Sequence, residues 1–396
     1  MPDIIQRLPD HIANQIAAGE VIQRPASAVK ELLENAVDSG ATRIQLIVKD
    51  AGKELVQVID NGSGMSEADA RLCFERHATS KILHVEDLFH IHTMGFRGEA
   101  LASIAAVSQV VLKTRKADCE LGTLLEIENG EIKKLEPCAC APGTSIAMKN
   151  LFFSVPARRH FLKTNTTEMR HIVEEFMHVA LAFPSITFIF EAGGMELFHL
   201  QAAGLKQRIM QVLGNHYNQR LVSVEENTDY LDVSGFVGKP EAAKRTRGDQ
   251  YFFVNDRFIR SGYLHHALMG AFSELIPSDS HPMYVLYIKL DPRRVDINVH
   301  PTKQEIKFED ERLIYAFLQS AVKHALARFS IAPTLDFELD ADIEHLSAVS
   351  QPFTEQKKAE ATATDIFKTF TQKYQAHAIE SSARYRETAS PMPVMP

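Results

Sequence analysis

The sequence lacks any hydrophobic run near the length of about eighteen residues that a membrane-spanning helix requires. Its N-terminus, MPDIIQRLPD, carries an acid early and has no apolar core of the kind found in secretory signal peptides. We therefore expect a cytoplasmic protein with no membrane partner.

Cysteine is also scarce. The four cysteines form one C-x-C pair and no C-x-x-C pair, and the nearest histidines show no zinc-binding spacing. The sequence therefore predicts reduced structural thiols and argues against a metal-thiolate site.

Positive charge is not in excess either. The net charge of −8 argues against a protein coated in positive charge, but it leaves room for a local basic groove. From residue 331 onward, ten acids and six bases give −4, so the first 330 residues carry the other −4. This last segment has little periodicity and a proline-rich end, which predicts a linker-like, largely disordered tail over residues 331–396.

What the chain does contain is a charged helix around KELLENAVDSGA, residues 30–41. Apolar residues recur there at helical spacing, Pro25 suits a first turn and Gly40 suits the position after the last, which predicts a helix over residues 25–39. The opposite face carries Glu31, Glu34, Asn35 and Asp38. Like charges at this spacing repel by about 0.2–0.5 kcal/mol per pair. A divalent cation or a catalytic task would offset that repulsion, and a solvated acidic face beside Lys30 is the alternative.

Two strands are predicted next, over residues 43–49 and 54–59, joined as a hairpin by DAGK. The second strand leads into DNGSGM, where Asp60 could accept a hydrogen bond from an exocyclic amine. Gly62 and Gly64 would let the backbone approach a flat ligand. The stretch is not a dinucleotide-binding fingerprint, because Glu67 stands at the third glycine position. An ordinary Asn-Gly turn is the alternative.

A polar stretch, ERHATSKI at 75–82, precedes GFRGEALASIAAVS at 95–108. A glycine-rich turn before a helix presents N–H donors to phosphate, although an ordinary loop and helix start would have the same pattern. No G-x-x-x-x-G-K-[ST] motif occurs, which excludes a P-loop NTPase. Farther on, PGTSIAMKNLF at 142–152 places Gly143 and Thr144 before another strand.

In this order, the motifs resemble the ATP-binding module called GHKL, which gyrase B, heat-shock chaperone ATPases, histidine kinases and MutL mismatch-repair proteins share. The resemblance is specifically to the MutL family and covers residues 1–330. It rests on IANQIAAGEVIQRPASAVKELLENAVDSGA, RHATSKI, GFRGEALASI and LFFSVPARRHFLK. It implies an α+β fold, with a GHKL (Bergerat) ATP-binding α/β sandwich over 1–205 and a ribosomal-S5-type αβ domain over 206–330 before the tail.

The resemblance also implies roles for individual residues. Glu31 would be the general base for water attack on the γ-phosphate, and Asn35 would ligate Mg²⁺. Asp60 would bind the adenine amino group, Gly64 would admit the base and Thr144 would support Asp60. The lid around the phosphates would comprise Thr79, Ser80, Gly95, Phe96, Arg97 and Gly98. Lys303, in DINVHPTKQEIKF, would reach the γ-phosphate. Glu34 and Asp38 receive no assigned role.

The second half is predicted to contain strands in residues 230–238, 249–260 and 282–291, and an amphipathic helix over 263–276. Residues 239–260 hold six bases against three acids, the best local candidate for nucleic-acid contact. The candidates are Lys244, Arg245, Arg247, Arg257 and Arg260. A solvated turn is the alternative, and weak binding is expected because Ser261 and Gly262 stand where related proteins often carry another base.

The function that the resemblance implies is an ATP-dependent clamp in DNA mismatch repair, with ATP and Mg²⁺ as cofactors. Nucleotide binding would close an N-terminal homodimer, which couples a MutS-type mismatch sensor to a downstream endonuclease or helicase, and hydrolysis would reset it. The clamp would bind DNA weakly and without sequence preference, at the nucleoid of a bacterial cytoplasm. No endonuclease activity is expected, because the D-Q-H-A-type metal motif is absent from this sequence.

Three other classes of protein fit the sequence less well. A histidine kinase would need a phospho-accepting helix and sensor parts ahead of the ATPase, and a chaperone ATPase would lack the pairing of GFRGEA with HPTK. A purely nucleic-acid-binding module would have no need of Glu31.

Overall fold

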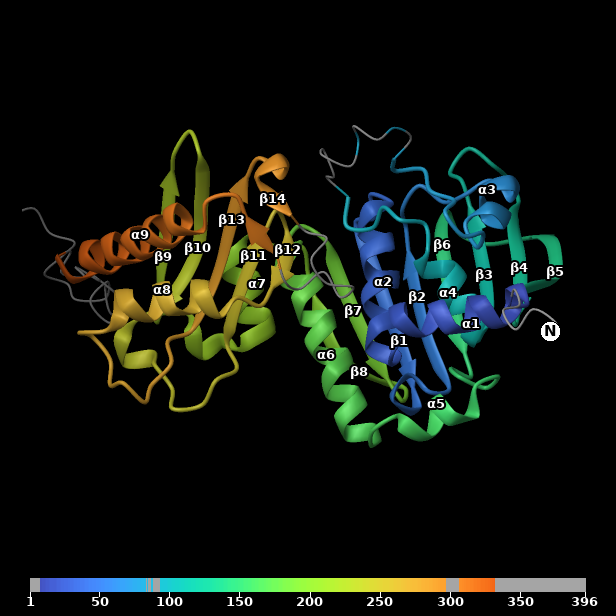
Figure 1. Ribbon diagram of the computed structural model, residues 1–396, viewed down its shortest axis with the longest axis horizontal. Coiled ribbons are helices and arrows are strands. Elements are labelled where there is room, and N and C mark those ends of the chain that lie inside the picture. The colour runs from blue at the N-terminus through green and yellow to red at the C-terminus, as the bar shows by residue number, and fades with distance from the viewer. Residues whose placement is uncertain (1–7, 83, 85–86, 88–92, 297–305, 332–396) are drawn as a thin grey trace, which may run out of the picture. The chain divides into compact units, whose positions relative to one another are not determined.

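The structure of the protein is a computed structural model that describes residues 8–331, apart from residues 83, 85–86, 88–92 and 297–305. These described residues belong to one compact unit. They form two large β-sheets with helices packed against them, so the α+β class predicted from the sequence is confirmed (Figure 1). Lys303 and the predicted tail beyond residue 331 lie outside the described residues.

The first sheet contains β1 to β8, which are Arg43–Lys49, Leu55–Asp60, Gln109–Arg115, Gly122–Glu128, Glu131–Cys138, Gly143–Lys149, Thr187–Ala192 and Met195–Leu200. The helices of this part are α1 (Asp10–Val21), α2 (Pro25–Asp38), α3 (Glu67–Leu72), α4 (Ala100–Val107), α5 (Pro156–Phe161) and α6 (Asn165–Ala182), with the 3₁₀ turn η1 (Asp50–Gly52). The strand order is β5-β4-β3-β6-β2-β1-β7-β8, in which only the β1–β7 pair is parallel among these neighbours.

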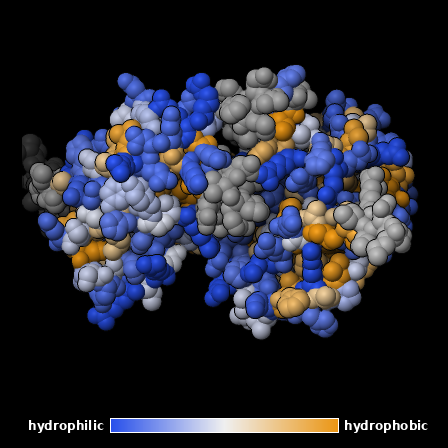
Figure 2. Space-filling view, viewed as in Figure 1, coloured by the Kyte–Doolittle hydropathy of each residue, from blue (hydrophilic) through white to orange (hydrophobic). Residues whose placement is uncertain are grey.

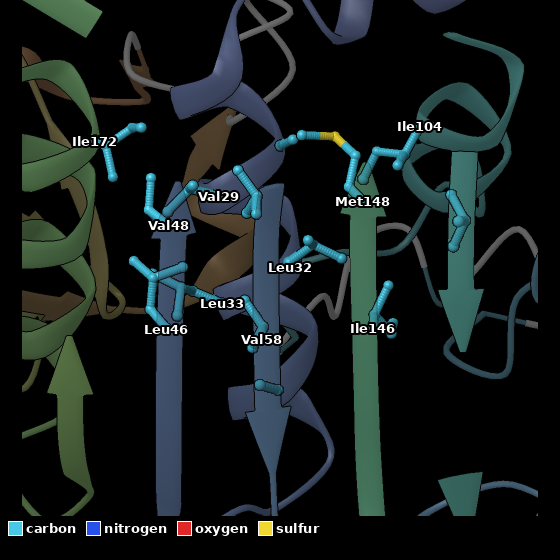
Figure 3. Packing of buried hydrophobic residues seen from close by; sticks show 14 of the residues in the cluster. Val29, Leu32, Leu33, Leu46, Val48, Val58, Ile104, Ile146, Met148 and Ile172 are labelled. Carbon is cyan, nitrogen blue, oxygen red and sulfur yellow. The ribbon is translucent and has the colours of Figure 1, made fainter. Parts of the chain in front are cut away.

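The predicted helix over residues 25–39 is confirmed as α2. Pro25 stands in its first turn, Ser39 caps its end and Gly40 follows with a φ of +75°. Its apolar stripe packs on alternate residues of the sheet, because successive side chains of a strand point to opposite faces. Figure 3 shows Val29, Leu32 and Leu33 lying over side chains of β1, β2 and β6, all of them buried.

The second sheet contains β9 to β13, which are Leu221–Asn227, Leu231–Gly238, Gln250–Val254, Arg257–Ile259 and Tyr284–Leu290, in the order β12-β11-β13-β10-β9. Its helices are α7 (Leu205–Leu213), α8 (Gly262–Phe272) and α9 (Glu311–Ile331), with 3₁₀ turns η3 (Asn215–Tyr217), η4 (Pro240–Ala242) and η5 (Pro292–Arg294). Two short strands, β14 (Val295–Asp296) and β15 (Lys307–Phe308), pair with each other in a separate antiparallel sheet. The strands predicted over 230–238 and 282–291 are confirmed as β10 and β13. The stretch 249–260 is instead a hairpin of β11 and β12 that turns at Asn255 and Asp256, and the predicted helix 263–276 is confirmed as α8 but ends at Phe272.

The two faces of the second sheet pack on different helices. One face forms a core with α8 and α9, to which Phe252, Leu286 and Ile288 contribute. The other forms a core with α6 and α7, to which Phe253 and Tyr287 contribute. Because α6 also packs on the first sheet, it belongs to the cores of both sheets.

Arg208 on α7 fixes the end of α6. Its side chain is fully buried, and its guanidinium donates to the carbonyl oxygens of Ala180 at 2.8 Å and Ile186 at 2.6 Å. Further bonds reach Pro184 O and Gln201 O, each at 3.0 Å. The last carbonyls of a helix have no partner within the helix, so a buried arginine can satisfy them. Burial lowers the pKa of Arg208 to about 10.

No helix in the part of the chain that the structure describes is long and apolar enough to cross a bilayer. The predicted division of residues 1–330 at position 205 stays a prediction, since the described residues form a single unit.

Candidate functional site

The acidic side chains on the polar face of α2 have different surroundings. Glu31 and Asn35 stand one turn apart and are both half-buried. Glu34 is only 3% exposed, and its Oε1 lies 3.8 Å from Lys30 Nζ. Glu34 therefore faces packed protein and not the solvated surface that the sequence left open as an alternative.

Asp38 holds the backbone at Met94 and at Gly95, the latter a residue of the predicted lid. Its Oδ1 accepts from the N–H of Met94 at 2.9 Å and its Oδ2 from the N–H of Gly95 at 3.0 Å. Lys81 Nζ lies 2.5 Å from the same Oδ2 and 3.4 Å from Asn35 Oδ1. This half-buried cluster connects α2 to the polar stretch 75–82 through Lys81, and to the glycine-rich stretch 95–108 through Gly95.

Asp60 lies at the end of β2, beside the end of α2. Its Oδ1 accepts from the N–H of Gly62 at 2.9 Å and from Ser39 Oγ at 3.4 Å. Burial raises the pKa of the Asp60 carboxyl, while hydrogen bonds from Gly62, Thr144 and Ser39 act in the opposite direction. Asp38 and Ser39 are consecutive, so one turn of α2 connects the lid residues to the predicted adenine ligand.

Thr144 lies opposite Asp60 in the β2–β6 ladder. Its Oγ1 is 3.0 Å from Thr114 Oγ1, and Thr114 also accepts from the N–H of Met65 at 2.9 Å. Gly64 has a φ of +64°, and a Cβ there would lie 2.1 Å from Arg115 O. Glycine is therefore required at position 64 by its backbone conformation and by its contact with β3, whether or not a ligand is present.

The lid residues that the structure describes pair with one another. The N–H of His77 donates to Gly98 O at 3.2 Å, and a Cβ at Gly98 would lie 2.3 Å from Ala78 O. Thr79 Oγ1 accepts from the N–H of Lys81 at 3.2 Å. Ser80 and Arg97 are exposed, and the Arg97 guanidinium lies 5.7 Å from the centre of the Phe96 ring.

Four of the five basic residues predicted to contact DNA are exposed. Lys244, Arg245 and Arg247 are exposed in the loop before β11, where Lys244 lies 2.7 Å from Asp249 and Arg245 lies 3.5 Å from Asp279. Arg260 is exposed after β12.

Arg257 lies apart from that group. It is 5% exposed, and its Nη2 donates to Thr93 O at 2.6 Å. The buried guanidinium cannot contact a DNA phosphate in this conformation, so we remove Arg257 from the DNA-contact group predicted from the sequence.

The structure thus brings Asn35, Asp60, Gly95 and Thr144 around the end of α2, with Glu31 one turn earlier. No role was predicted from the sequence for Ser39, Lys81, Thr114 or Asp38. Asp38 and Ser39 stand in the helix motif and Lys81 in RHATSKI, so their neighbourhood was visible in the sequence, but the contacts of all four depend on how distant segments pair.

Two family models match the chain. One, described as histidine kinase-, DNA gyrase B- and HSP90-like ATPase, matches residues 23–139, and the other, described as DNA mismatch repair protein, C-terminal domain, matches residues 209–327. The chain is 56% identical over 364 residues to the DNA mismatch repair protein MutL of Flavobacterium psychrophilum, covering 92% of this chain and 58% of that protein. It is 58% identical over 344 residues to the MutL of Flavobacterium johnsoniae, covering 87% of this chain and 53% of that protein. The chain therefore spans little more than half the length of these relatives.

Solved structures agree with the fold. The N-terminal domain of a DNA repair protein superposes with a TM-score of 0.70 at 22% identity, covering 81% of this chain and 99% of that one. The Aquifex aeolicus MutL ATPase domain complexed with ADP superposes with a TM-score of 0.53 at 26% identity, covering 75% of this chain and 98% of that one.

Proposed function

The chain belongs to the MutL family of DNA mismatch-repair proteins and corresponds to their ATPase region, and we propose that it binds and hydrolyses Mg-ATP. The observation that carries the proposal is the cluster at the end of α2, where Asp38 holds residues 94 and 95 and Ser39 contacts Asp60. A predicted phosphate-binding turn and a predicted adenine ligand thereby meet on one helix. The related Aquifex aeolicus domain was solved as a complex with ADP.

Asp60 is proposed to select adenine. A carboxylate accepts a hydrogen bond from the exocyclic amine of adenine, whereas guanine presents a carbonyl oxygen at the corresponding position. Gly62 and Ser39 hold one carboxylate oxygen in place, and the ladder partner Thr144 supports the end of the strand.

Asn35 is proposed to ligate Mg²⁺. Its Oδ1 already faces a cation, the Lys81 ammonium at 3.4 Å, so the position suits positive charge. No group of three or more His, Cys, Asp or Glu side chains in the described residues could hold a metal alone. Mg²⁺ commonly takes few protein ligands and several phosphate and water oxygens, so a single amide oxygen could serve. The bound ion would neutralise charge on the phosphates.

Glu31 is proposed to accept a proton from the attacking water. It stands one helical turn before Asn35 on the same face, which places a base beside the metal ligand. Phosphate oxygens would receive N–H bonds from the turn over residues 95–98, which precedes α4, and a charge contact from Lys303. Thr79, Ser80, Phe96 and Arg97 would complete the lid.

For the whole protein we propose the role inferred from the sequence. Mg-ATP would close an N-terminal dimer that couples a MutS-type mismatch sensor to a downstream endonuclease or helicase, and hydrolysis would reopen it. Exposed side chains at Lys244, Arg245, Arg247 and Arg260 would give weak, sequence-independent binding to DNA.

Calorimetric titration of the purified chain with ADP and Mg²⁺ tests the nucleotide site, with GDP as the matched control. The proposal expects binding of ADP and much weaker binding of GDP. Failure to bind ADP would reject the nucleotide site, and equal affinity for the two would reject the role of Asp60.

A further inference from the structure

Arg257, the first residue of β12, reaches from the second sheet to the backbone beside the nucleotide site. Its Nη2 donates to Thr93 O at 2.6 Å, although 164 positions separate the two residues. Its side chain is almost fully buried. A buried hydrogen bond with a charged donor contributes more than a neutral one, and breaking it leaves a buried group unsatisfied.

Residues 93–95 are held from the other side by α2. The N–H groups of Met94 and Gly95 donate to the two oxygens of Asp38, and Thr93 Oγ1 donates to Gly95 O at 2.9 Å. Three consecutive residues are therefore fixed between Arg257 and Asp38. Asp38 in turn shares Lys81 with Asn35, the proposed metal ligand.

The β11–β12 hairpin, which carries Arg257, packs against α6. The ring of Phe258 stacks on that of His178 in α6, with centres 3.5 Å apart and planes 10° apart. A cavity of about 20 Å³ remains at this contact, which is room for about one water molecule. It is lined by Glu34 of α2, Glu175 of α6 and Arg257 of the hairpin, and by Met94 of the segment that Arg257 contacts. This packing holds the β11–β12 hairpin against α6, beside the segment that Arg257 contacts.

We infer that Arg257 is a positioning residue for nucleotide binding. It sets the backbone of residues 93–95 against Asp38 and thereby makes the site depend on the β11–β12 hairpin of the second sheet. It touches no reacting atom. This inference rests on the proposed nucleotide site.

The test compares Arg257→Gln and Arg257→Lys with Arg312→Gln, which changes an exposed arginine on α9. MgADP affinity is measured by calorimetry, and kcat at saturating ATP by phosphate release. We expect Arg257→Gln to weaken MgADP about tenfold, the loss of about one charged hydrogen bond, and Arg257→Lys to recover part of it. The kcat should change less than about threefold, because binding and not the reacting geometry is affected.

A purely structural role would lower the melting temperature of Arg257→Gln and leave the nucleotide affinity of the folded protein unchanged. That result would overturn the inference. If wild-type protein bound no MgADP, the proposed function would fail as well, so the two failures are distinguishable.

A double-mutant cycle with Asp38→Asn adds a second measurement. If Arg257 acts through residues 93–95, the double variant should bind MgADP at least about fivefold tighter than the product of the two single losses predicts. Additive losses would show that Arg257 and Asp38 act separately, which contradicts the inference.

Discussion

The N–H of Met94 donates to Oδ1 of Asp38 across 2.9 Å, although 56 positions separate these two residues. This bond explains one of the carboxylates crowded on α2. Glu34 turns to the cavity at the β11–β12 hairpin, Asp38 binds the backbone of residues 94 and 95, and Glu31 stays beside Asn35. The repulsion expected between neighbouring acids is reduced because Lys30 and Lys81 accompany Glu34 and Asp38.

Asn35→Ala should weaken nucleotide binding only when Mg²⁺ is present, because the variant removes a proposed metal ligand. We expect the affinity for MgADP to fall about tenfold and the affinity for ADP in EDTA to stay the same. Calorimetry with and without Mg²⁺ measures both values, and Asn218→Ala, at an exposed position, is the control. If Mg²⁺ increased the affinity for ADP equally in Asn35→Ala and in wild type, Asn35 would not be a ligand of the metal.

Asp60 should give the stability a measurable pH dependence. Burial raises the pKa of its carboxyl above the ordinary value of 3.8. A raised pKa in the folded state favours folding at low pH, and this contribution is lost as the pH rises through the folded pKa. Wild type should therefore lose stability relative to Asp60→Asn as the pH rises above 3.8, as measured by urea denaturation at several pH values.

Asp69 offers a control of opposite sign. A hydrogen bond from Ser66 holds the pKa of the Asp69 carboxyl below its ordinary value. Wild type should gain stability relative to Asp69→Asn as the pH rises toward 3.8, where the folded carboxyl is already ionised and the unfolded one is not, by a small amount because Asp69 is exposed. If the stability difference between wild type and variant changed with pH in the same direction for Asp60→Asn and Asp69→Asn, the burial assigned to Asp60 would be contradicted.

The sequence predicted those parts of the fold and site that depend on short-range patterns. The stripe of α2, the hairpin β1–β2 and the order of glycine-rich turns are all visible within a few residues. The bond between Asp38 and Met94, the four carbonyls around Arg208 and the pairing of Thr114 with Thr144 depend on segments far apart in the chain.

Arg257 shows how a local sequence pattern can also lead to a wrong prediction. A basic stretch that reads as a strand suggested a row of phosphate contacts, and the sequence grouped Arg257 with Arg260. Residues three apart on a strand point to opposite faces. Arg257 and Ile259, the two ends of β12, are buried, whereas Arg260, the next residue, is exposed.

DNA binding should depend on the loop before β11. Reversing Arg245 and Arg247 to Glu should lower the affinity and reduce the slope of log K against log salt by about 2, since each phosphate contact contributes about 0.9. The control reverses Arg312 and Arg328 on α9, which changes the net charge equally. Fluorescence anisotropy over a salt series gives the slopes, and an unchanged slope for the loop variant would place the DNA site elsewhere.

The chain should be a monomer without nucleotide and partly a dimer with a non-hydrolysable ATP analogue and Mg²⁺. Leu8, Ile12 and Ile16 are 52%, 38% and 52% exposed, and Figure 2 shows apolar side chains at the surface around α1. Exposed apolar residues of this kind suit packing on a second copy. A ligand favours the dimer only as far as it binds the dimer more tightly.

Light scattering across protein concentrations measures this change. Ile12→Glu with Ile16→Glu should abolish the increase in mass, whereas Leu313→Glu, an exposed apolar position on α9, should not. A wild-type mass fixed at one chain at high concentration, with the analogue bound, would reject the nucleotide-induced dimer.

The most direct test of the ATPase is Glu31→Ala, with Glu54→Ala as the exposed control. A base acts on the attacking water and contributes little to ground-state binding, so the affinity for the non-hydrolysable analogue should stay within about twofold. Steady-state phosphate release should fall at least about a hundredfold in Glu31→Ala and remain at the wild-type rate in Glu54→Ala. An unchanged kcat in Glu31→Ala would contradict the account of this site as an ATPase that uses Glu31.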